Sequence, residues 1–370
     1  MRVMMRCENS PARAKLLTLF ETVSRGRTDL SLGDFDDAQL DWIIRSGLGP
    51  ACFHAAKENQ ENFTSRHWQS LKAADLTARW IGADHRDAMT EIIDASCGSV
   101  PQLTLLKGIS IAEEFYPEFH LRPMRDIDLL VPVESLAPMA TLLYGLGYRQ
   151  TSDAPHKTYD SHHHVMPFFH DEKQVWVELH HRLISAKNHA SHGRVFQPSH
   201  VSSQIKASMF QGRTVHRLSP ELQVVYLAVH WAQDFKEVGG MIAALDLIFL
   251  LQQMGDSLRW ENIFAWIDQS TALTYLHLLL SYLESRQLIS LPDGILQRFY
   301  LDQPVFGNLT LKAVHKIVDQ YMLDGASFGS LLSRRTLNVA WETLTLPIPS
   351  VCKLLLMPIN LCMPSQFRIQ

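Results

Sequence analysis

Two aspartates two positions apart stand in a stretch that otherwise has the pattern of a buried β-strand. Asp126 and Asp128 alternate with Ile127, Leu129 and Val131. Because side chains alternate across a strand, both carboxylates share one face and the apolar residues pack on the other. Aspartate is disfavoured in strands, and two like charges side by side repel unless a cation lies between them. The pattern therefore predicts a divalent metal site at Asp126 and Asp128.

A second strand-like run supplies a third carboxylate. In residues 174–180, Glu178 lies on the face opposite Val175, Val177 and Leu179. Mg²⁺ prefers oxygen ligands and holds substrate phosphates through its remaining coordination positions. Three carboxylates on adjacent strands are therefore the ligand set expected of a two-metal phosphoryl-transfer site.

The two aspartates alone also fit a strand end that is exposed to solvent and paired with Arg122 or Arg125. The residues upstream favour a site instead. In residues 105–110 a strand ends in a glycine turn at Gly108 and a helix begins. The first turn of a helix presents backbone N–H groups, so this junction is a natural pocket for an anion.

Ten of the 18 histidines lie between His156 and His200. Imidazoles bind zinc, so a zinc site in this segment is an alternative, although no HExxH or Cys/His spacing is present. His164 and His180 both could approach the face that carries Glu178. We expect His180 to line the active site or to orient a carboxylate.

Two further polar residues stand inside apolar helical runs, His230 and Asp246. A buried polar group needs a partner, so they either bond each other or a backbone carbonyl, or face the cleft and contact the acceptor substrate. The tryptophans at helical spacing are most simply core residues. They are Trp68, Trp80, Trp260, Trp266 and Trp341.

The elements around these residues fall into three blocks. Residues 1–100 have helical periodicity, with a helix capped by Asp36 or Asp37. Residues 101–185 form an α+β block, a small mixed β-sheet with helices behind it. Residues 186–370 return to helical periodicity. The helical candidates in the last block are residues 220–235, 240–254, 260–269, 271–286, 309–323 and 328–343.

Composition excludes several classes of protein. Hydrophobic residues make up 46% of the 370 residues and charged residues 19%, which is typical of a folded globular chain. The formal net charge of -4 gives no overall positive field, so we expect no long nucleic-acid partner. The five cysteines are scattered, and no apolar run is long enough for an export signal or a membrane span. We therefore expect a cytoplasmic protein.

Four segments together resemble a known superfamily. They are LLKGISIAEEFYPEFHLRPMRDIDLLVPVESL, a helix ending in LGY, HHHVMPFF and VWVELHHRL. They look like poorly characterised nucleotidyltransferases of the DNA polymerase β superfamily. The later segments LAVHWAQDF and ALDLIFLL extend the similarity through most of the chain.

The resemblance implies a set of roles for matching residues. Gly108, with Ser110 near it, would cradle the triphosphate of an NTP, and Asp126 and Asp128 would bind Mg²⁺ or Mn²⁺. Glu178 is the residue that fits a third acidic ligand. The positively charged side chains that could neutralise phosphate are Lys107 and Arg122 or Arg125.

Two features depart from the superfamily pattern. Gly108 is followed by Ile109, and 18 positions separate Gly108 from Asp126.

The expected activity is transfer of a nucleoside monophosphate from an NTP to an acceptor, a small molecule or a protein, with release of pyrophosphate. Two alternatives are an inactive nucleotide-binding or scaffold protein of the same fold and a zinc-dependent hydrolase built on the histidines.

Overall fold

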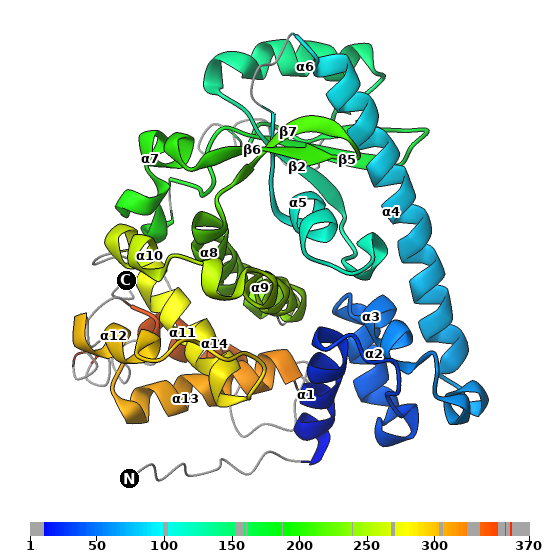
Figure 1. The fold of residues 1–370 in the computed structure, drawn as a ribbon, viewed down its shortest axis with the longest axis vertical. Coiled ribbons are helices and arrows are strands. Elements are labelled where there is room, and N and C mark those ends of the chain that lie inside the picture. Colours follow the sequence, from blue (N-terminus) through cyan, green and yellow to red (C-terminus); the bar gives the residue numbers. More distant parts are fainter. Residues whose placement is uncertain are drawn as a thin grey trace.

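The protein is a mixed β-sheet that lies over two groups of helices (Figure 1). The computed structural model describes residues 11–98, 103–151, 159, 162–186, 188–238, 240–267, 271–302, 306–323, 334–346, 352 and 356. The N-terminal helices and the C-terminal helices lie side by side below the sheet in Figure 1. This arrangement confirms the predicted α+β class, with a sheet core flanked by helical regions at both ends.

The N-terminal region consists of four α-helices. They are α1 (Pro11–Ser24), α2 (Asp37–Arg45), α3 (Gly49–Ala56) and α4 (Trp68–Ser96). The predicted cap of α2 is confirmed, because Asp36 and Gln39 form a capping box at its start. The long helix α4 runs from this region up to the sheet (Figure 1). The prediction that Trp80 is a core residue is wrong: its side chain lies on the outer face of α4 and is 72% exposed.

Seven strands form one sheet. They are β1 (Thr104–Leu105), β2 (Asp126–Leu130), β3 (Arg149–Gln150), β4 (Phe168–His170), β5 (Val175–His180), β6 (Ile205–Phe210) and β7 (Arg213–Leu218). Their order is β3-β4-β5-β2-β1-β7-β6. The pairs β2–β5 and β1–β7 are parallel and the other pairs are antiparallel, so the sheet is mixed as predicted.

The hairpin of β6 and β7 differs from the prediction that residues after 186 are helical. It adds two strands to the sheet through the pairing of β7 with β1, which carries the α+β core to Leu218. Its turn is Gln211-Gly212, with φ angles of 48° and 77°. Positive φ at both positions is typical of a two-residue hairpin turn, but glutamine rarely adopts it, so the sequence signal is weak.

One face of the sheet is an apolar core. Ile127, Leu129, Val177 and Leu179 are fully buried there. They pack in one cluster with side chains of α4, of α5 (Lys107–Glu114) and of α6 (Leu136–Gly145). Branched apolar residues that alternate along both strands produce this face.

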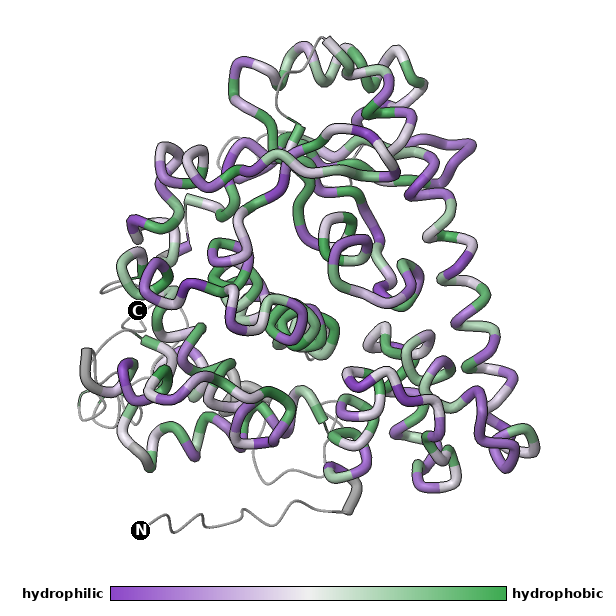
Figure 2. The backbone as a smooth tube through the Cα atoms, in the orientation of Figure 1, coloured by the Kyte–Doolittle hydropathy of each residue, from purple (hydrophilic) through white to green (hydrophobic). Residues whose placement is uncertain are grey.

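The C-terminal region consists mainly of helices, of which α8 and α9 lie between the sheet and the helices farther along the chain (Figure 1). They are α7 (Pro198–Ser203), α8 (Pro220–Val238), α9 (Met241–Met254), α10 (Trp260–Trp266), α11 (Thr271–Ser285), α12 (Ile295–Asp302), α13 (Asn308–Val318) and α14 (Arg334–Leu344). Figure 2 shows α9 as an almost uniformly hydrophobic helix, in agreement with its burial at the centre of these helices. Most described α-helices therefore match the predicted ones within a few residues.

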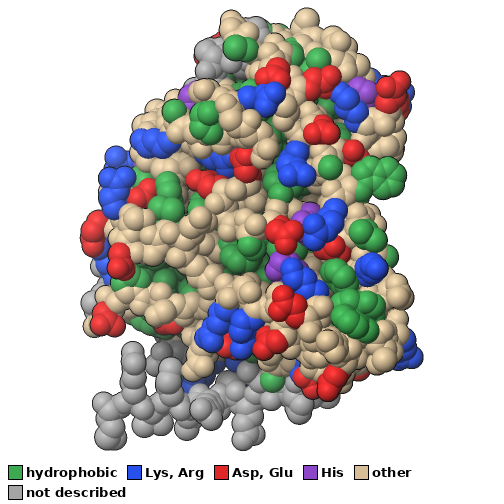
Figure 3. All heavy atoms as spheres, turned by 45° about the vertical axis from the view of Figure 1, so that its right-hand side comes forward, with side chains coloured by type: hydrophobic (Ala, Val, Ile, Leu, Met, Phe, Trp, Pro, Cys, Tyr) green, Lys and Arg blue, Asp and Glu red, His purple; other side chains and the backbone are tan. Residues whose placement is uncertain are grey.

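Short helical turns connect the larger elements. They are η1 (Leu32–Asp34), η2 (Gln60–Thr64), η3 (Phe119–Leu121), η4 (Val133–Ser135), η6 (His189–His192), η7 (Arg194–Phe196), η8 (Gly255–Ser257) and the π-helical turn η9 (Asp319–Leu323). Among the described helices, none is by itself long and apolar enough to cross a membrane, and only the bent pair of α9 and α10 reaches that length and composition together. On the face shown in Figure 3, acidic and basic side chains alternate without a broad basic area.

Candidate active site

The register between β2 and β5 determines which side chains lie together in the site. The two strands are parallel, with Asp128 opposite Glu178 and Asp126 opposite Trp176. Paired residues of neighbouring strands point to the same face, so the three carboxylates lie on one side of the sheet, as predicted. The next residue on this face of β5 is His180, which is fully buried.

Asp128 is paired with the side chains of Lys107 and His180. Lys107 Nζ donates a hydrogen bond to Asp128 Oδ1 at 2.8 Å, and His180 Nε2 lies 2.7 Å from the same oxygen. Burial on its own raises the pKa of the Asp128 carboxyl, but Lys107 and His180 outweigh burial and hold this pKa well below its usual range. Asp128 is therefore ionised and firmly held.

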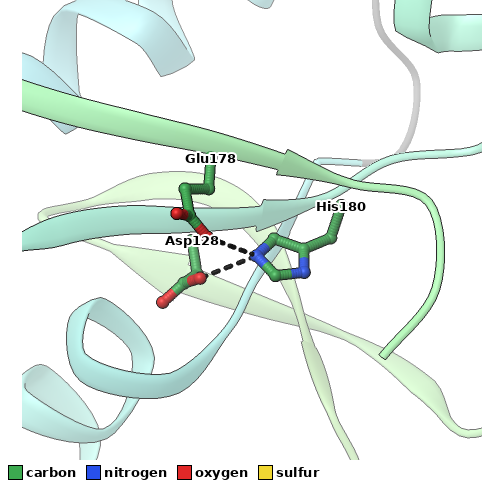
Figure 4. A group of neighbouring side chains, drawn as sticks. All are labelled: Asp128, Glu178 and His180. Carbon is green, nitrogen blue, oxygen red and sulfur yellow. Dashed lines mark hydrogen bonds and ion pairs between the residues drawn. The ribbon is translucent and has the colours of Figure 1, made fainter. Parts of the chain in front are cut away.

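Glu178 approaches the same imidazole. Figure 4 shows Asp128 and Glu178 on their two strands with both carboxylates directed at His180. Glu178 Oε2 lies 3.4 Å from His180 Nε2. Burial lowers the pKa of His180, but its bonds to Asp128 and Glu178 outweigh burial and raise that pKa. Asp128, Glu178 and His180 each offer one possible metal-ligand atom, and these three atoms lie within 4.8 Å of one another.

Asp126 lies outside that closest group, and its environment differs. Burial, followed by the negative charges of Asp128 and Glu178, raises the pKa of Asp126 to about 7. Three carboxylates are therefore close together on one face of the sheet, and the nearby cationic groups do not fully offset their repulsion. A divalent cation fits this donor set, because it supplies two positive charges to oxygen ligands.

The junction of β1 and α5 brings Lys107 to this face. Leu106 donates its backbone N–H to the carbonyl of Asp128 at 3.0 Å, which ties the junction to β2. Lys107 has a φ of 44°, a strained conformation for a residue with a side chain, and such strain is common at functional sites. A Cβ atom on Gly108 would lie 3.1 Å from Met124 Cβ, a tight contact, so this close packing favours glycine.

Ser110, which the resemblance places near the triphosphate, lies in the first turn of α5. Its side chain is buried, and its Oγ has no hydrogen-bond partner among the described residues. It lines a cavity of about 10 Å³ with Lys107, Gln223 and Tyr226, which is room for about one water molecule. The structure therefore places Ser110 in a small closed space beside Lys107 and Tyr226.

Arg122 lies beside Gly108 and near enough to Asp126 to interact with its charge, but its ion pair is with Asp246. Its guanidinium forms a two-pronged ion pair with Asp246 of α9, with Nε–Oδ1 at 3.0 Å and Nη2–Oδ2 at 2.9 Å. Tyr116 Oη donates to the same carboxylate at 2.7 Å. Asp246 thus bonds Arg122 and Tyr116, and the arrangement favours a structural role for Arg122 over the predicted phosphate contact. Arg125 is exposed immediately before β2.

The histidines gather beside the carboxylates. The rings of His162, His163 and His164 pack against one another and His180, with centroids 4.9 to 5.3 Å apart for the closest pairs. Burial lowers the pKa of His163 to about 2, so its imidazole is neutral. Of the histidines that the structure describes, only His180 belongs to a group of three possible metal ligands. The described residues therefore do not form a histidine-rich zinc site. His156 lies outside the described residues.

Helix α8 faces the carboxylates from the C-terminal region. The rings of Tyr226 and His230, one turn apart, are nearly parallel with centroids 6.3 Å apart. Val229 and Trp231 are fully buried, whereas His230 keeps part of its surface. Burial, followed by Lys107, lowers the pKa of His230 to about 3. Sequence reasoning overlooked Tyr226, although its four-residue spacing from His230 is a helical signal.

The contact of Lys107 with Asp128 was also missed, because the sequence suggested a phosphate as its partner. The proximity of His180 to both carboxylates was signalled by its two-residue spacing from Glu178 on one strand face. The structure therefore brings together Lys107, Asp126, Asp128, Glu178 and His180.

Comparison with known proteins gives one family match. A family model described as an uncharacterised nucleotidyltransferase matches residues 36–286. The match begins at the cap of α2, includes the whole sheet and runs just past α11. No curated protein and no solved structure matches the chain. Because the matched stretch covers more than half of the 370 residues, the chain belongs to this uncharacterised nucleotidyltransferase family.

Proposed function

We propose that this protein transfers a nucleoside monophosphate from an NTP to an acceptor, a small molecule or a protein side chain, and releases pyrophosphate in a metal-dependent reaction. The observation that carries the proposal is the parallel register that sets Asp128 beside Glu178, with Asp126 on the same face. Family membership supports nucleotidyl transfer as the class of reaction.

The metal would be held by Asp128, Glu178 and Asp126, with His180 Nε2 close enough to act as a further ligand. Bound there, Mg²⁺ or Mn²⁺ would neutralise charge on the triphosphate and polarise the α-phosphate. Oxygen ligands suit both ions, and an imidazole ligand suits Mn²⁺ better than Mg²⁺. We therefore expect Mn²⁺ to bind more tightly than Mg²⁺.

The side chains of this site would bind and orient the donor and accept a proton. Lys107 and the backbone of Gly108 lie at the N-terminus of α5, where positive charge and N–H groups favour phosphate. The oxygen of the acceptor forms a bond to the α-phosphorus, the bond from that phosphorus to pyrophosphate breaks, and the acceptor proton passes to Glu178. Arg125, exposed beside β2, is a further candidate for phosphate contact.

The proposal is tested with an NTP labelled at the α-phosphate. The full chain is incubated with Mn²⁺, the labelled NTP and either a protein extract or a small-molecule extract, and label transfer and pyrophosphate are measured. The expected result is transfer that falls at least about a hundredfold in Glu178→Gln, a loss typical of removing a catalytic group. Equal transfer by folded Glu178→Gln protein would contradict the assignment.

A second candidate function is nucleotide binding without transfer. The observation that favours it is that Asp128 is already paired with Lys107 and His180, which compensate its charge without a metal. Such a protein would bind an NTP equally well in EDTA and in Mn²⁺ and would release no pyrophosphate. For the transferase we expect NTP binding to be stronger in Mn²⁺ than in EDTA, and pyrophosphate to be released.

A further inference from the structure

A cavity of about 280 Å³ lies beyond the ends of β2 and β5, between the sheet and α7. Leu130, the last residue of β2, lines it, and so do His181, Arg182 and Leu183, which directly follow β5. Because β2 and β5 are parallel, both strands reach the cavity with their carboxyl ends. The carboxyl ends of parallel strands are a common place for ligands to bind, so this cavity is positioned to hold a small molecule.

The cavity is separate from the carboxylates. Leu130 and His180 are register partners, and they follow the pair Asp128–Glu178 along the two strands. Leu130 belongs to the lining of the cavity, whereas Asp128, Glu178 and His180 do not. A ligand in the cavity would therefore occupy a site distinct from the one proposed for the NTP.

The wall of the cavity offers apolar surface that a ligand can reach. Leu130 and Phe196 are each 7% exposed and Val201 is 6% exposed, while Val133 at the opening is 65% exposed. These side chains come from β2, η7, α7 and η4, so several elements of the fold shape the cavity. An apolar cavity of roughly 150 Å³ is sufficient to hold benzene, so about 280 Å³ has room for an apolar group and a small polar head.

Two opposite charges line the same cavity without a partner. Glu134 and Arg182 are both exposed to solvent. Within the described part of the chain, neither side chain forms an ion pair or a hydrogen bond, with the other or with any third residue. Burial lowers the pKa of His181, so this neighbouring imidazole is neutral and adds no charge. A ligand that carries one anionic and one cationic group beside an apolar group would complement the whole lining.

We propose that this cavity binds a free α-amino acid with an apolar side chain. The side chain packs on Leu130, Phe196 and Val201, the carboxylate binds Arg182, and the ammonium group binds Glu134. The planar guanidinium matches a carboxylate with two parallel N–H donors, and the apolar wall gains from burial of the ligand side chain. The proposal does not depend on nucleotidyl transfer.

The test uses L-leucine and two analogues that each lack one charge, 4-methylpentanoate without the amine and 3-methylbutylamine without the carboxylate. Each is titrated into the full chain by calorimetry, and we expect L-leucine to bind most tightly. Arg182→Gln should weaken L-leucine and 4-methylpentanoate about three- to tenfold and leave 3-methylbutylamine unchanged. Glu134→Gln should weaken L-leucine and 3-methylbutylamine and leave 4-methylpentanoate unchanged.

Two further variants control the test. Arg149→Gln removes an exposed arginine of β3 that is paired with Asp171, and it should change none of the three affinities. Val201→Trp fills the cavity and should abolish L-leucine binding while NTP binding is retained, which separates this site from the carboxylates. The proposal is overturned if the wild-type protein does not bind L-leucine, if either analogue binds as tightly as L-leucine, or if Arg182→Gln and Glu134→Gln leave its affinity unchanged.

Discussion

At the scale of single residues, the two aspartates of β2 occupy opposite electrostatic environments. Asp128 is stabilised as an anion by Lys107 and His180, whereas burial and the neighbouring carboxylates raise the pKa of Asp126 to about 7. One aspartate is therefore anchored, and the other is held close to like charges. A divalent cation would bind favourably at this site, because its charge offsets the repulsion between the carboxylates.

Asp126→Asn should stabilise the metal-free protein. The amide keeps the size of the side chain and removes its repulsion with Asp128 and Glu178, so we expect the free energy of unfolding in EDTA to rise by about 1 kcal/mol. Urea denaturation measures this change. The control, Asp87→Asn on the exposed face of α4, should change it by less than about 0.5 kcal/mol. Lower stability of Asp126→Asn in EDTA would contradict this account of the site.

At the scale of elements, the β1–α5 junction fixes the position of the cationic side of the site. Lys107 adopts positive φ, and the next residue, Gly108, packs closely against Met124. The junction is also bonded to the backbone of Asp128 through Leu106. Its geometry therefore sets the distance between the helix N-terminus and the carboxylates.

Gly108→Ala should destabilise the protein by about 1–2 kcal/mol, because the added methyl lies too close to Met124 Cβ. Gly145→Ala provides the matched control. Gly145 lies in α6, and a Cβ built on it meets no atom within 4 Å, so alanine there should stabilise by about 0.5 kcal/mol through helix propensity. Thermal and urea unfolding of both variants measure the contrast. Equal effects of the two substitutions would show that Gly108 is not sterically required.

The sequence was sufficient to predict the strands that carry the carboxylates, because alternation of side chains is a local property. It predicted which faces Asp126, Asp128 and Glu178 share, and the cap of α2. It did not predict the hairpin of β6 and β7, whose turn residues carry little signal. Nor could it show that Arg122 pairs with Asp246, since 124 positions separate them and only the tertiary fold brings them together.

At the scale of the whole molecule, one buried ion pair joins the sheet core to the C-terminal helices. Arg122 lies just before β2, and Asp246 lies inside α9 with none of its surface exposed. Tyr116 completes the hydrogen bonds of that carboxylate. The ion pair therefore fixes α9, which packs against α8, to the segment that leads into β2.

Asp246→Asn should destabilise the protein by about 3–5 kcal/mol, because it leaves the Arg122 charge buried without its counterion. The comparison is Glu261→Gln, which breaks an ion pair with Arg298 in which Glu261 is largely exposed. We expect that change to cost less than about 1 kcal/mol. Urea denaturation of both variants distinguishes a structural pair from a surface one. A small effect of Asp246→Asn would contradict the structural role of Arg122 and favour a phosphate contact instead.

The central claim is that the carboxylates of β2 and β5 form a metal-dependent nucleotide site. It is tested most directly by calorimetric titration of each NTP into the protein with Mn²⁺, with Mg²⁺ and with EDTA, beside the double variant Asp126→Asn/Glu178→Gln. The account predicts binding that requires metal and weakens by at least about tenfold, roughly 1.4 kcal/mol, in the variant. NTP binding of equal affinity in EDTA and in the folded variant would contradict it.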